Sequence, residues 1–398
     1  MLTLKSNSEL YKMNILFLVS NDGGNGVGGH YNSVNQVSLE MAKEHNVKVV
    51  TLGSRTSPVV QDNPYFDCHV MVGKGPGTLI KLNRELKKIT KEFKPDVVNC
   101  FDSDSMNRIL LLPVMFGAPI VFTKCGGKNP SGKKYQHADA IVVFSNENRD
   151  WFINNEEYKS NDIFLIPNRV QKLQFLEESK RVELKDPGKI TFVRISRLGG
   201  AYEKTLLDTF NLIEELNRNY PVELVVIGRI QDETRFGALV KNASDRNLPV
   251  RYITDERAAK GSGFLYLADF VVGTGRSFME ATSLGIPALT PASNSDFPVL
   301  VNNANFNSFF DTNFSERNVA SDEAIKNNLS TIQQLIENKD KYEGSRKEML
   351  TLFREYFGVE GILLKYNAVY NYVVSKRAGR LGLIRRNFLY LVKFFMGK

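Results

Sequence analysis

Short apolar or β-branched runs alternate with longer helical patterns through most of this sequence. The first run, Asn14–Ser20, has an apolar centre of five residues, which is typical of a strand buried on both faces of a parallel sheet. A glycine-rich loop follows it, and then a helical stretch from about His30 to Lys43. Strand, loop and helix in this order predict βαβ units, so we expect an α/β protein with doubly wound sheets.

The alternation occurs in two series, separated by a charged segment. The segment Gln171–Gly188 has no strand pattern and ends in Asp-Pro-Gly, as a linker does. The predicted strands after the first are Val47–Leu52, Val97–Cys100, Ile120–Thr123, Ala140–Phe144 and Ile163–Ile166 in one series, and Ile190–Ile195, Glu223–Ile227, Arg251–Ile253, Phe270–Gly273 and Ala288–Thr290 in the other. From about Ser321 the pattern is helical, through Lys341–Phe357 and Gly361–Ser375.

These patterns predict two Rossmann-like, doubly wound domains facing a cleft, with a helical C-terminal segment. The expected boundaries are residues 1–170 for the first domain, 171–188 for the linker, 189–357 for the second domain, 358–375 for a C-terminal helix, and 376–398 for a tail. Ligands of such sheets bind outside the carboxyl ends of the strands.

Composition excludes several classes of protein. The chain has 398 residues, of which 42% are hydrophobic and 24% charged, so disordered, collagen-like and fibrous classes do not fit. Its three cysteines, Cys68, Cys100 and Cys125, form no CxxC pair, which argues against a disulfide framework or a thiolate metal cage. The residues before Met13 are polar and unlike a signal peptide, and we expect a cytoplasmic protein.

The loop Gly23–Gly29 matches the dinucleotide fingerprint GxGxxG at Gly24, Gly26 and Gly29. Its backbone amides and the following helix end could hold a phosphate or an oxyanion. The second strand ends without the acid that holds a ribose hydroxyl, and Arg55 there would permit the 2′-phosphate of NADP. An NADP-binding oxidoreductase therefore remains one interpretation, and glycines that only permit tight turns are another.

A second signature runs from Gly273 to Leu289. The predicted strand Phe270–Gly273 leads into a turn of small residues, and a helix is expected to begin near Ser277. Ser277 with Glu280 has the spacing of a capping box, which would give both residues a purely structural role. A helix N-terminus at the carboxyl end of a strand is equally an anion site, and Arg276 adds a permanent positive charge.

This strand, the Gly-x-Gly turn, Glu280-Ala281 and the following Gly285-Ile286-Pro287 resemble the donor-binding motif of GT-B glycosyltransferases, specifically the retaining family four. That family commonly has two glutamates eight positions apart, and the second holds the ribose of the nucleotide. Glu280 matches the second glutamate, whereas Val272 stands where the first would be. The resemblance implies that Thr274, Gly275, Arg276 and Ser277 bind the donor with Glu280.

Other segments carry the same resemblance. Ile195-Ser196-Arg197-Leu198, followed by Glu203-Lys204, resembles the family segment whose arginine and lysine grip the donor diphosphate, although the spacing here is longer by two residues. Gly228 ends a strand that in the family lies beside the nucleobase, and Ile166-Pro167-Asn168 resembles the signature before the interdomain linker. Gly28 and Gly29 resemble the family's first loop, and Cys125 falls where the family often has a histidine.

The resemblance implies a hexosyltransferase-type enzyme with an acceptor-side first domain and a second domain that binds the nucleotide sugar. Arg197, Lys204 and Glu280 are the expected catalytic residues. Arg197 and Lys204 are fixed cations that would stabilise a leaving diphosphate, and Glu280 would hold the ribose. We expect Gly28, Gly29 and Gly228 on the donor, and His30 and Asp102 on the acceptor side. No metal and no cofactor are expected: Asp102-Ser103-Asp104 could attract a hard cation, but a cap of the next helix is the favoured role.

The acceptor class implied by the family is a growing surface glycan or lipid-linked sugar in polysaccharide biosynthesis. Two alternatives remain open on the sequence: a GT-B sugar-nucleotide epimerase, which has no acceptor, and a non-catalytic GT-B partner protein, which Val272 and Cys125 would suit. No nucleic-acid-binding module surrounds the basic residues.

The net charge of +8 lies almost wholly in the last 23 residues. Seven basic residues and no acid occur there: Lys376, Arg377, Arg380, Arg385, Arg386, Lys393 and Lys398. Removing these seven leaves +1 for residues 1–375. Apolar residues of the tail fall at helical spacing, so residues 376–398 predict an interfacial helix on an anionic membrane, at the inner face of the cell membrane. The resemblance implies that the helix within residues 358–375 packs back on the first domain, because GT-B chains often end in this way. The alternative for the tail is that it forms this final packed helix itself.

Overall fold

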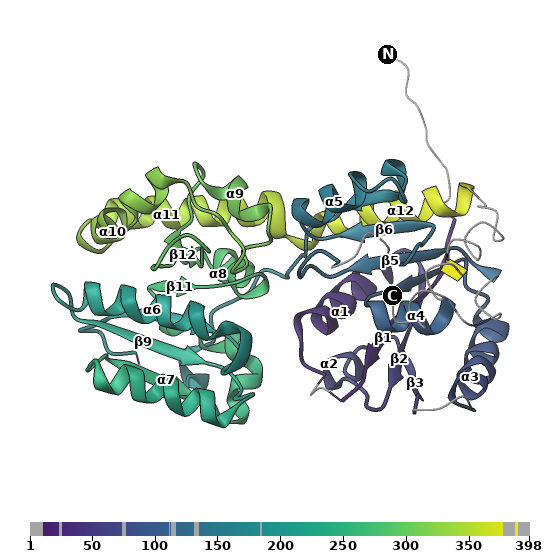
Figure 1. Ribbon diagram of the computed structural model, residues 1–398, viewed down its shortest axis with the longest axis horizontal. Helices are drawn as coiled ribbons and strands as arrows, with labels where there is room; N and C mark the ends of the chain where they lie inside the picture. Colours follow the sequence, from purple (N-terminus) through teal and green to yellow (C-terminus); the bar gives the residue numbers. More distant parts are fainter. Residues whose placement is uncertain are drawn as a thin grey trace, which may run out of the picture. The chain divides into compact units, whose positions relative to one another are not determined.

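The computed structural model describes residues 11–23, 26–73, 77–110, 112, 117–130, 135–183, 185–376 and 387–388. The chain forms two compact units (Figure 1). The first comprises the described residues within 1–144, 148–166 and 360–398, and the second those within 145–147 and 167–359. Each unit has its own sheet and its own hydrophobic core.

The sheet of the first unit has, within the described residues, seven strands in the order β3-β2-β1-β4-β5-β6-β7, all parallel. The strands are β1 (Asn14–Asn21), β2 (Asn46–Gly53), β3 (Phe66–Met71), β4 (Val97–Cys100), β5 (Ile120–Lys124), β6 (Ala140–Val143) and β7 (Ile163–Leu165). The central strands are almost entirely buried, as their continuous apolar runs require.

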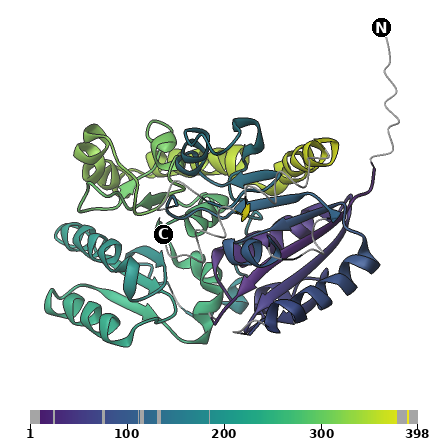
Figure 2. The same ribbon diagram turned by 45° about the vertical axis from the view of Figure 1, so that its right-hand side comes forward.

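Helices cover both faces of this sheet, because its strands are apolar on both sides. The helices are α1 (Gly29–Met41), α2 (Pro58–Gln61), α3 (Gly77–Phe93), α4 (Ser103–Leu110), α5 (Asn146–Ile153) and α12 (Ile362–Lys376). Leu82 and Leu86 of α3 share a core with Met106 and Ile109 of α4 on one face. Helices α1 and α12 contact each other. Helix α12, which is yellow in Figure 1 and Figure 2, also contacts β5.

Helix α12 returns the end of the chain to the first unit and is held there by buried polar contacts. Tyr370 is fully buried, and its hydroxyl accepts a hydrogen bond of 2.8 Å from the amide of Asn99 in β4. Asn367 lies 2.7 Å from the His45 ring and donates to Glu44 at 2.9 Å. These contacts join residues more than 270 positions apart, so α12 is part of this fold.

The sheet of the second unit has, among the residues described, the order β10-β9-β8-β11-β12-β13, parallel except for β13. Its strands are β8 (Ile190–Ile195), β9 (Val222–Ile227), β10 (Val250–Ile253), β11 (Phe270–Val272), β12 (Ala288–Thr290) and β13 (Val299–Leu300). Apolar side chains of β8, β9 and β11 alternate between two cores, one on each face of the sheet.

One face of the second sheet is covered by α6 (Glu203–Leu216), α7 (Glu233–Asp245) and α10 (Asp322–Glu337), whose apolar residues share a core with β8 and β11. The other face is covered by the segment η5 (Glu256–Leu267), α8 (Arg276–Ser283), α9 (Phe306–Phe310) and α11 (Lys339–Leu352). A π-helical turn, Phe353–Phe357, ends α11 and adds Phe353 and Phe357 to this core.

The expected fold class is confirmed: both units are α/β with doubly wound, mainly parallel sheets, and the C-terminal segment is helical. Two strands were not expected. Strand β3 is an edge strand with polar and half-exposed residues, and β13 has only two residues. The helix expected over Lys341–Phe357 is α11 followed by the π-helical turn. The tail 376–398 lies outside the described residues except for Lys376, Asn387 and Phe388.

The contact between Tyr370 and Asn99 yields a stability prediction. Tyr370→Phe removes the one acceptor found for the buried Asn99 amide group among the described residues, so the free energy of unfolding of the first unit should fall by about 1–3 kcal/mol. Trp151 is the only tryptophan of the chain and lies in the first unit, so its fluorescence during urea unfolding measures this unit.

Tyr372→Phe is the matched control on the same helix. Its hydroxyl bonds Asp162 at 2.6 Å at a partly exposed position, where water can replace the lost partner. We expect a loss below about 1 kcal/mol for this variant. Equal losses for the two variants would contradict a specific role of the Asn99 contact.

Candidate functional site

Strands β8 and β11 lie at the centre of the second sheet, where the strand order reverses. They pair in parallel, with Val272 beside Arg194. After β8 the chain enters α6 on one face of the sheet, and after β11 it enters α8 on the other. Doubly wound sheets bind ligands outside the carboxyl ends of the strands at such a switch point.

Arg197 follows β8 and is exposed at this edge. Its guanidinium donates a hydrogen bond of 2.7 Å to the Tyr202 hydroxyl, and its central carbon lies 4.9 Å from the centre of the Tyr202 ring. No ion pair with a carboxylate is found for Arg197 among the residues that the structure describes. The side chain is therefore oriented by an aromatic ring and keeps its charge available to an anion.

Lys204 lies in the first turn of α6 and is already paired. Its ammonium nitrogen is 2.8 Å and 3.1 Å from the two carboxylate oxygens of Asp208. The Lys204 side chain is 62% exposed, whereas that of Asp208 is 7% exposed. Burial raises the pKa of the Asp208 carboxyl, and Lys204 opposes that shift. Lys204 thus compensates a buried carboxylate here and would have to leave it to reach a diphosphate.

Gly228, directly after β9, lies against the end of β8. A Cβ atom at this position would be 1.7 Å from the carbonyl oxygen of Ser196 and 3.4 Å from the Leu198 side chain. No side chain fits there. Only glycine at this position lets the end of β9 approach the end of β8 so closely. Gly228 thereby fixes the path of the segment that carries Arg197.

The turn after β11 differs from the expected capping box. Helix α8 begins at Arg276, and Gly275, with φ of 48°, occupies the N-cap position. Ser277 lies inside the helix, where its hydroxyl accepts a hydrogen bond from the Thr274 amide and donates one to the Thr274 carbonyl, both at 3.0 Å. The capping-box prediction is wrong because the left-handed glycine starts the helix earlier than Ser277.

Two amides expected to hold an anion already have acceptors within the chain. The Thr274 amide donates to Ser277, and the Gly275 amide donates to the carbonyl of Phe314 at 3.2 Å. Phe314 also stacks on Phe278 of α8, with ring centres 4.0 Å apart. Phe314 thus packs against one side of the turn. The guanidinium of Arg276 then provides the hydrogen-bond donors that remain for an anion.

Arg276 and Glu280 form a pair on the first two turns of α8. The Arg276 Nε lies 2.8 Å from a Glu280 carboxylate oxygen, while its Nη1 is buried without a hydrogen-bond partner among the described residues. Burial raises the pKa of the Glu280 carboxyl, and the Arg276 charge opposes the shift. The glutamate expected to hold a ribose and the arginine expected to hold a phosphate therefore lie side by side.

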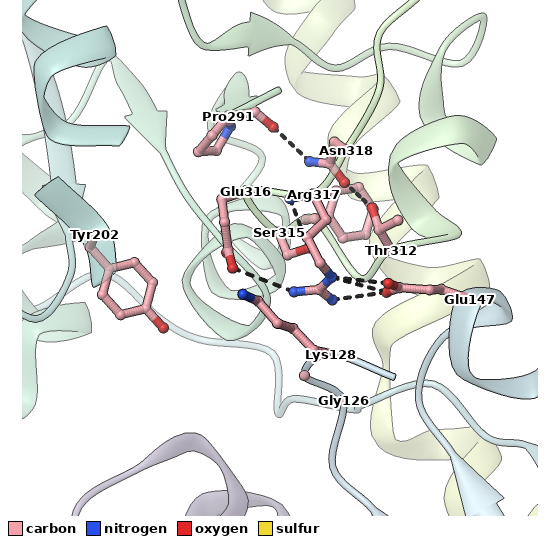
Figure 3. A network of polar contacts seen from close by, with 12 residues as sticks. Gly126, Lys128, Glu147, Tyr202, Pro291, Thr312, Ser315, Glu316, Arg317 and Asn318 are labelled. Carbon is pink, nitrogen blue, oxygen red and sulfur yellow. Dashed lines mark hydrogen bonds and ion pairs between the residues drawn. The ribbon is translucent and has the colours of Figure 1, made fainter. Parts of the chain in front are cut away.

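The segment 312–318 is fixed by its own polar network (Figure 3). Asn318 is fully buried and donates to the Pro291 carbonyl at 2.7 Å. Arg317 makes a bidentate contact with Glu147, with its Nη2 at 2.9 Å and its Nε at 3.1 Å from the carboxylate oxygens. Figure 3 shows the Arg317 guanidinium between Glu147 and Glu316. This network holds Phe314 against the turn of α8.

In the first unit, a cavity of about 580 Å³ lies at the carboxyl ends of β1, β4 and β5. Its lining combines acidic, basic and aromatic side chains. The lining residues are Ser20, Asn21, Asp22, His30, Tyr31, Phe101, Asp102, Ser103, Asp104, Phe122, Lys124, Cys125, Gly126, Lys128, Pro130 and Tyr135. Aromatic faces beside hydrogen-bonding groups suit a polar ring compound with apolar faces.

His30 and Asp102, the two residues expected on the acceptor side, both line this cavity. His30 lies in the first turn of α1, with its ring centre 3.8 Å from that of Tyr31. Gly28 is the N-cap of α1 and Gly29 its first residue, whereas Gly24 of the fingerprint lies outside the described residues. A Cβ at Gly28 would come within 3.3 Å of the His30 ring.

Asp102 has a structural role whatever else it does. Its carboxylate accepts hydrogen bonds from the Ser20 amide at 2.6 Å, from the Ser20 hydroxyl at 2.5 Å and from the Ser105 amide at 2.7 Å. The last contact is the helix cap favoured for this residue by the sequence. The carboxylate also ties the end of β1 to the start of α4.

Cys125 and Lys124 line the cavity beside Asp102. Burial raises the pKa of the Cys125 thiol well above its usual value, so the group stays protonated at neutral pH. Lys124 is buried, and its ammonium donates to the carbonyls of Gly126 at 2.6 Å and Lys128 at 3.0 Å. Cys125 is the residue that the resemblance placed where the family often has a histidine, whereas Lys124, the last residue of β5, was not expected to line a cavity.

Arg194 is the most unusual residue that the sequence analysis did not single out. It interrupts the apolar run of β8 and is fully buried. The sequence feature that could have identified Arg194 is a charged residue inside a strand that is predicted to be buried on both faces. Within the described ranges, no group of three or more histidine, cysteine or acidic residues could hold a metal ion.

Comparison with known proteins shows the fold. No protein-family model matches the chain, and no curated protein sequence matches it either. Among solved structures, it is similar to HepE from Anabaena in complex with UDP and glucose, with 14% identity and a TM-score of 0.65 over 90% of this chain and 99% of that chain. A glycosyltransferase from Rickettsia africae gives 15% identity and a TM-score of 0.68 over 92% and 99%.

A UDP-N-acetylglucosamine 2-epimerase is also similar, with 15% identity and a TM-score of 0.52 over 85% of this chain and 91% of that chain. The chain therefore has the GT-B fold. Because proteins with this fold include both transferases and an epimerase, the function has to be argued from the site.

The contact of Gly228 with Ser196 yields a second prediction. Gly228→Ala places a Cβ where the Ser196 carbonyl lies, so the ends of β8 and β9 must separate. We expect the free energy of unfolding to fall by about 3 kcal/mol, measured by thermal unfolding.

Gly237→Ala in α7 is the matched control. A Cβ at Gly237 meets no atom within 4 Å, and alanine favours the helix by about 1 kcal/mol, so this variant should be more stable than the parent. A Gly228→Ala variant as stable as Gly237→Ala would show that the close approach of the two strand ends is not required.

Proposed function

We propose that this protein is a glycosyltransferase that moves a sugar from a nucleotide-sugar donor to an acceptor. The observation that carries the proposal is the pair of guanidinium groups at the switch point of the second sheet. Arg197 follows β8 and Arg276 starts α8, and neither has all its donors satisfied by the residues that the structure describes. The likeness of the fold to that of HepE, whose structure contains UDP, supports a nucleotide as the ligand of this edge.

Transfer of a sugar from a nucleoside diphosphate requires positive charge at the position where the leaving group develops negative charge. As the bond from the sugar to the diphosphate breaks, fixed cations stabilise the departing phosphate more than the bound donor. Arg197 and Arg276 suit this role, with Glu280 as acceptor for the ribose hydroxyls and Gly228 beside the base. Lys204 joins only if it exchanges Asp208 for the phosphate.

Retention of the anomeric configuration and a hexose as the transferred sugar belong to this proposal as well. In front-side displacement the leaving phosphate accepts the proton of the acceptor hydroxyl, so no protein base is required. The proposal includes neither a metal nor another cofactor. The donor diphosphate is then neutralised by side chains alone.

The cavity of the first unit is proposed as the acceptor site. Its aromatic side chains, Tyr31, Phe101, Phe122 and Tyr135, suit the apolar face of a sugar ring, and Asp104 offers an acceptor for hydroxyl groups. Burial and the charge of Asp102 raise the pKa of the Asp104 carboxyl. A growing surface glycan or a lipid-linked sugar has the chemistry to fill such a site.

The basic tail is proposed to bring the enzyme to the inner face of the cell membrane. Helix α12 ends at Lys376, which pairs with Asp162, and Asn387 exchanges hydrogen bonds of 3.0 Å and 2.8 Å with the backbone of His137. The tail is thus attached to the first unit at Asn387. No helix within the described ranges is long and apolar enough to cross a membrane.

The donor assay tests the proposal. Incubation with UDP-, GDP- and dTDP-sugars should release a nucleoside diphosphate, and Arg197→Ala should lower kcat/KM for that release by roughly 10²–10³. Glu280→Ala should weaken donor binding, since it removes the ribose acceptor. Arg218→Ala is the control, because Arg218 is exposed and pairs only with Glu215 among the residues described.

Three other results would each overturn the proposal. An isomerised nucleotide sugar as the product identifies an epimerase, whose fold is also similar. No binding and no turnover of any donor identifies a non-catalytic protein. An unchanged donor affinity in Glu280→Ala shows that the α8 motif is wrongly assigned.

The membrane proposal has its own test. The triple variant Arg385→Gln, Arg386→Gln and Lys393→Gln removes three positive charges from the tail and should lose at least about tenfold in affinity for phosphatidylglycerol vesicles. Sedimentation with phosphatidylcholine vesicles is the control, since no electrostatic attraction is expected there. Equal binding of the parent and the variant to anionic vesicles contradicts the proposal.

A further inference from the structure

Arg194 is a buried cation in the centre of the second sheet. It lies in β8, has no solvent exposure, and is the largest of the fully buried side chains described. Its position in the register is beside Val272 of β11, so both residues belong to the strand pair of the switch point. Register partners in a parallel sheet project to the same face, here the face covered by α6.

The Arg194 guanidinium is held by neutral groups only. Its Nη2 donates to the Thr205 hydroxyl of α6 at 2.9 Å, and its Nη1 donates to the Val272 carbonyl at 3.2 Å. Its Nε has no hydrogen-bond partner within the part of the chain that the structure describes. No carboxylate among the described residues forms an ion pair with it.

The group nevertheless carries its charge at neutral pH. Burial lowers the pKa of Arg194 to about 10, with opposing contributions from Tyr202, Asp208 and Glu316. Asp208 is already paired with Lys204, and Glu316 lies beside Arg317. A buried guanidinium without a carboxylate is costly, and arginines in such positions are otherwise paired.

The contacts of Arg194 join the two segments that carry the proposed donor ligands. Thr205, its partner on α6, donates in turn to the Tyr202 carbonyl at 2.9 Å, and Tyr202 orients Arg197. Val272, its partner on β11, is followed directly by the turn that starts α8 at Arg276. One side chain therefore connects the supports of Arg197 and Arg276.

Val272, the neighbour of Arg194 on β11, supplies no negative charge to pair with the guanidinium. A carboxylate at this position would project to the same face as Arg194 and neutralise it within the protein. Valine cannot do so, and the only oxygen that residue 272 offers is its backbone carbonyl. The positive charge below the strand ends thus remains for a ligand.

We propose that Arg194 is a positioning residue whose charge is balanced by the diphosphate of a ligand bound at the carboxyl ends of β8 and β11. The inference rests on the proposed function for the identity of that ligand, a nucleoside diphosphate. Arg194 acts from beneath the site: it holds the two ligand-bearing segments together and makes the site selective for anions.

Binding of inorganic pyrophosphate, and of UDP against uridine, to the full chain tests the role of Arg194. Arg194→Met should lower the affinity for pyrophosphate and for UDP at least about tenfold, because a buried charge near the phosphates is lost. The affinity for uridine should change less than about twofold. Arg194→Lys keeps the charge and should restore most of the pyrophosphate affinity.

Thermal unfolding of the free protein separates this role from a structural one. Arg194→Met removes a costly unpaired charge but also two buried hydrogen bonds, and the two effects oppose each other, so the melting temperature should change by less than about 5 °C. The control Arg251→Met removes an arginine of β10 that is paired with Glu183 and Glu223, so it should lower the melting temperature and leave the ratio of UDP to uridine affinity unchanged.

A melting temperature of Arg194→Met lowered by more than about 5 °C, with an unchanged pyrophosphate affinity, would overturn the inference and make Arg194 a structural residue. The proposed function fails in a different way. If the parent protein binds pyrophosphate in an Arg194-dependent manner but neither binds nor turns over any nucleoside diphosphate derivative, the anion site stands and the glycosyltransferase assignment falls.

Discussion

The parallel pairing of β8 with β11 is the constraint on which the second unit's proposed site depends. It places the ends of two strands side by side while sending the chain to opposite faces of the sheet. Arg197 and Arg276 reach the same edge for this reason, although 79 positions separate them in the sequence. Gly228 and Phe314 then fix the two segments from either side, one by steric fit and one by a hydrogen bond and a stacked ring.

The alternation of apolar runs and helical patterns predicted most of this architecture, because strands buried on both faces have an unambiguous sequence pattern. Strand β3 was missed for the opposite reason: Phe66–Met71 is an edge strand whose polar residues interrupt the apolar pattern. The family resemblance implied a helix that packs back on the first domain, but not its contacts. Asn99 and His45, the partners of Tyr370 and Asn367 in α12, come near this helix only in the folded chain.

The site was predictable to the level of motifs and no further. The Glu280-Ala281 motif predicts a helix after the turn that follows β11. The capping box predicted there does not form, since Gly275 adopts a positive φ that a sequence pattern does not reveal, and α8 starts at Arg276. The pairing of Lys204 with Asp208 has ordinary helix spacing but depends on the burial of Asp208 in the tertiary structure. Arg194 was recognisable in the sequence as a charged residue within an apolar strand. That no carboxylate among the described residues pairs with it is evident only in the folded sheet.

We propose that the switch point of the second sheet binds the diphosphate of a nucleotide sugar. A crystal structure of the protein with a bound nucleoside diphosphate is the decisive experiment. Phosphate oxygens should lie within hydrogen-bonding distance of Arg197 or Arg276, at the carboxyl ends of β8 and β11. Phosphates bound instead at the glycine turn before α1, as in an NADP-dependent enzyme, would contradict this proposal.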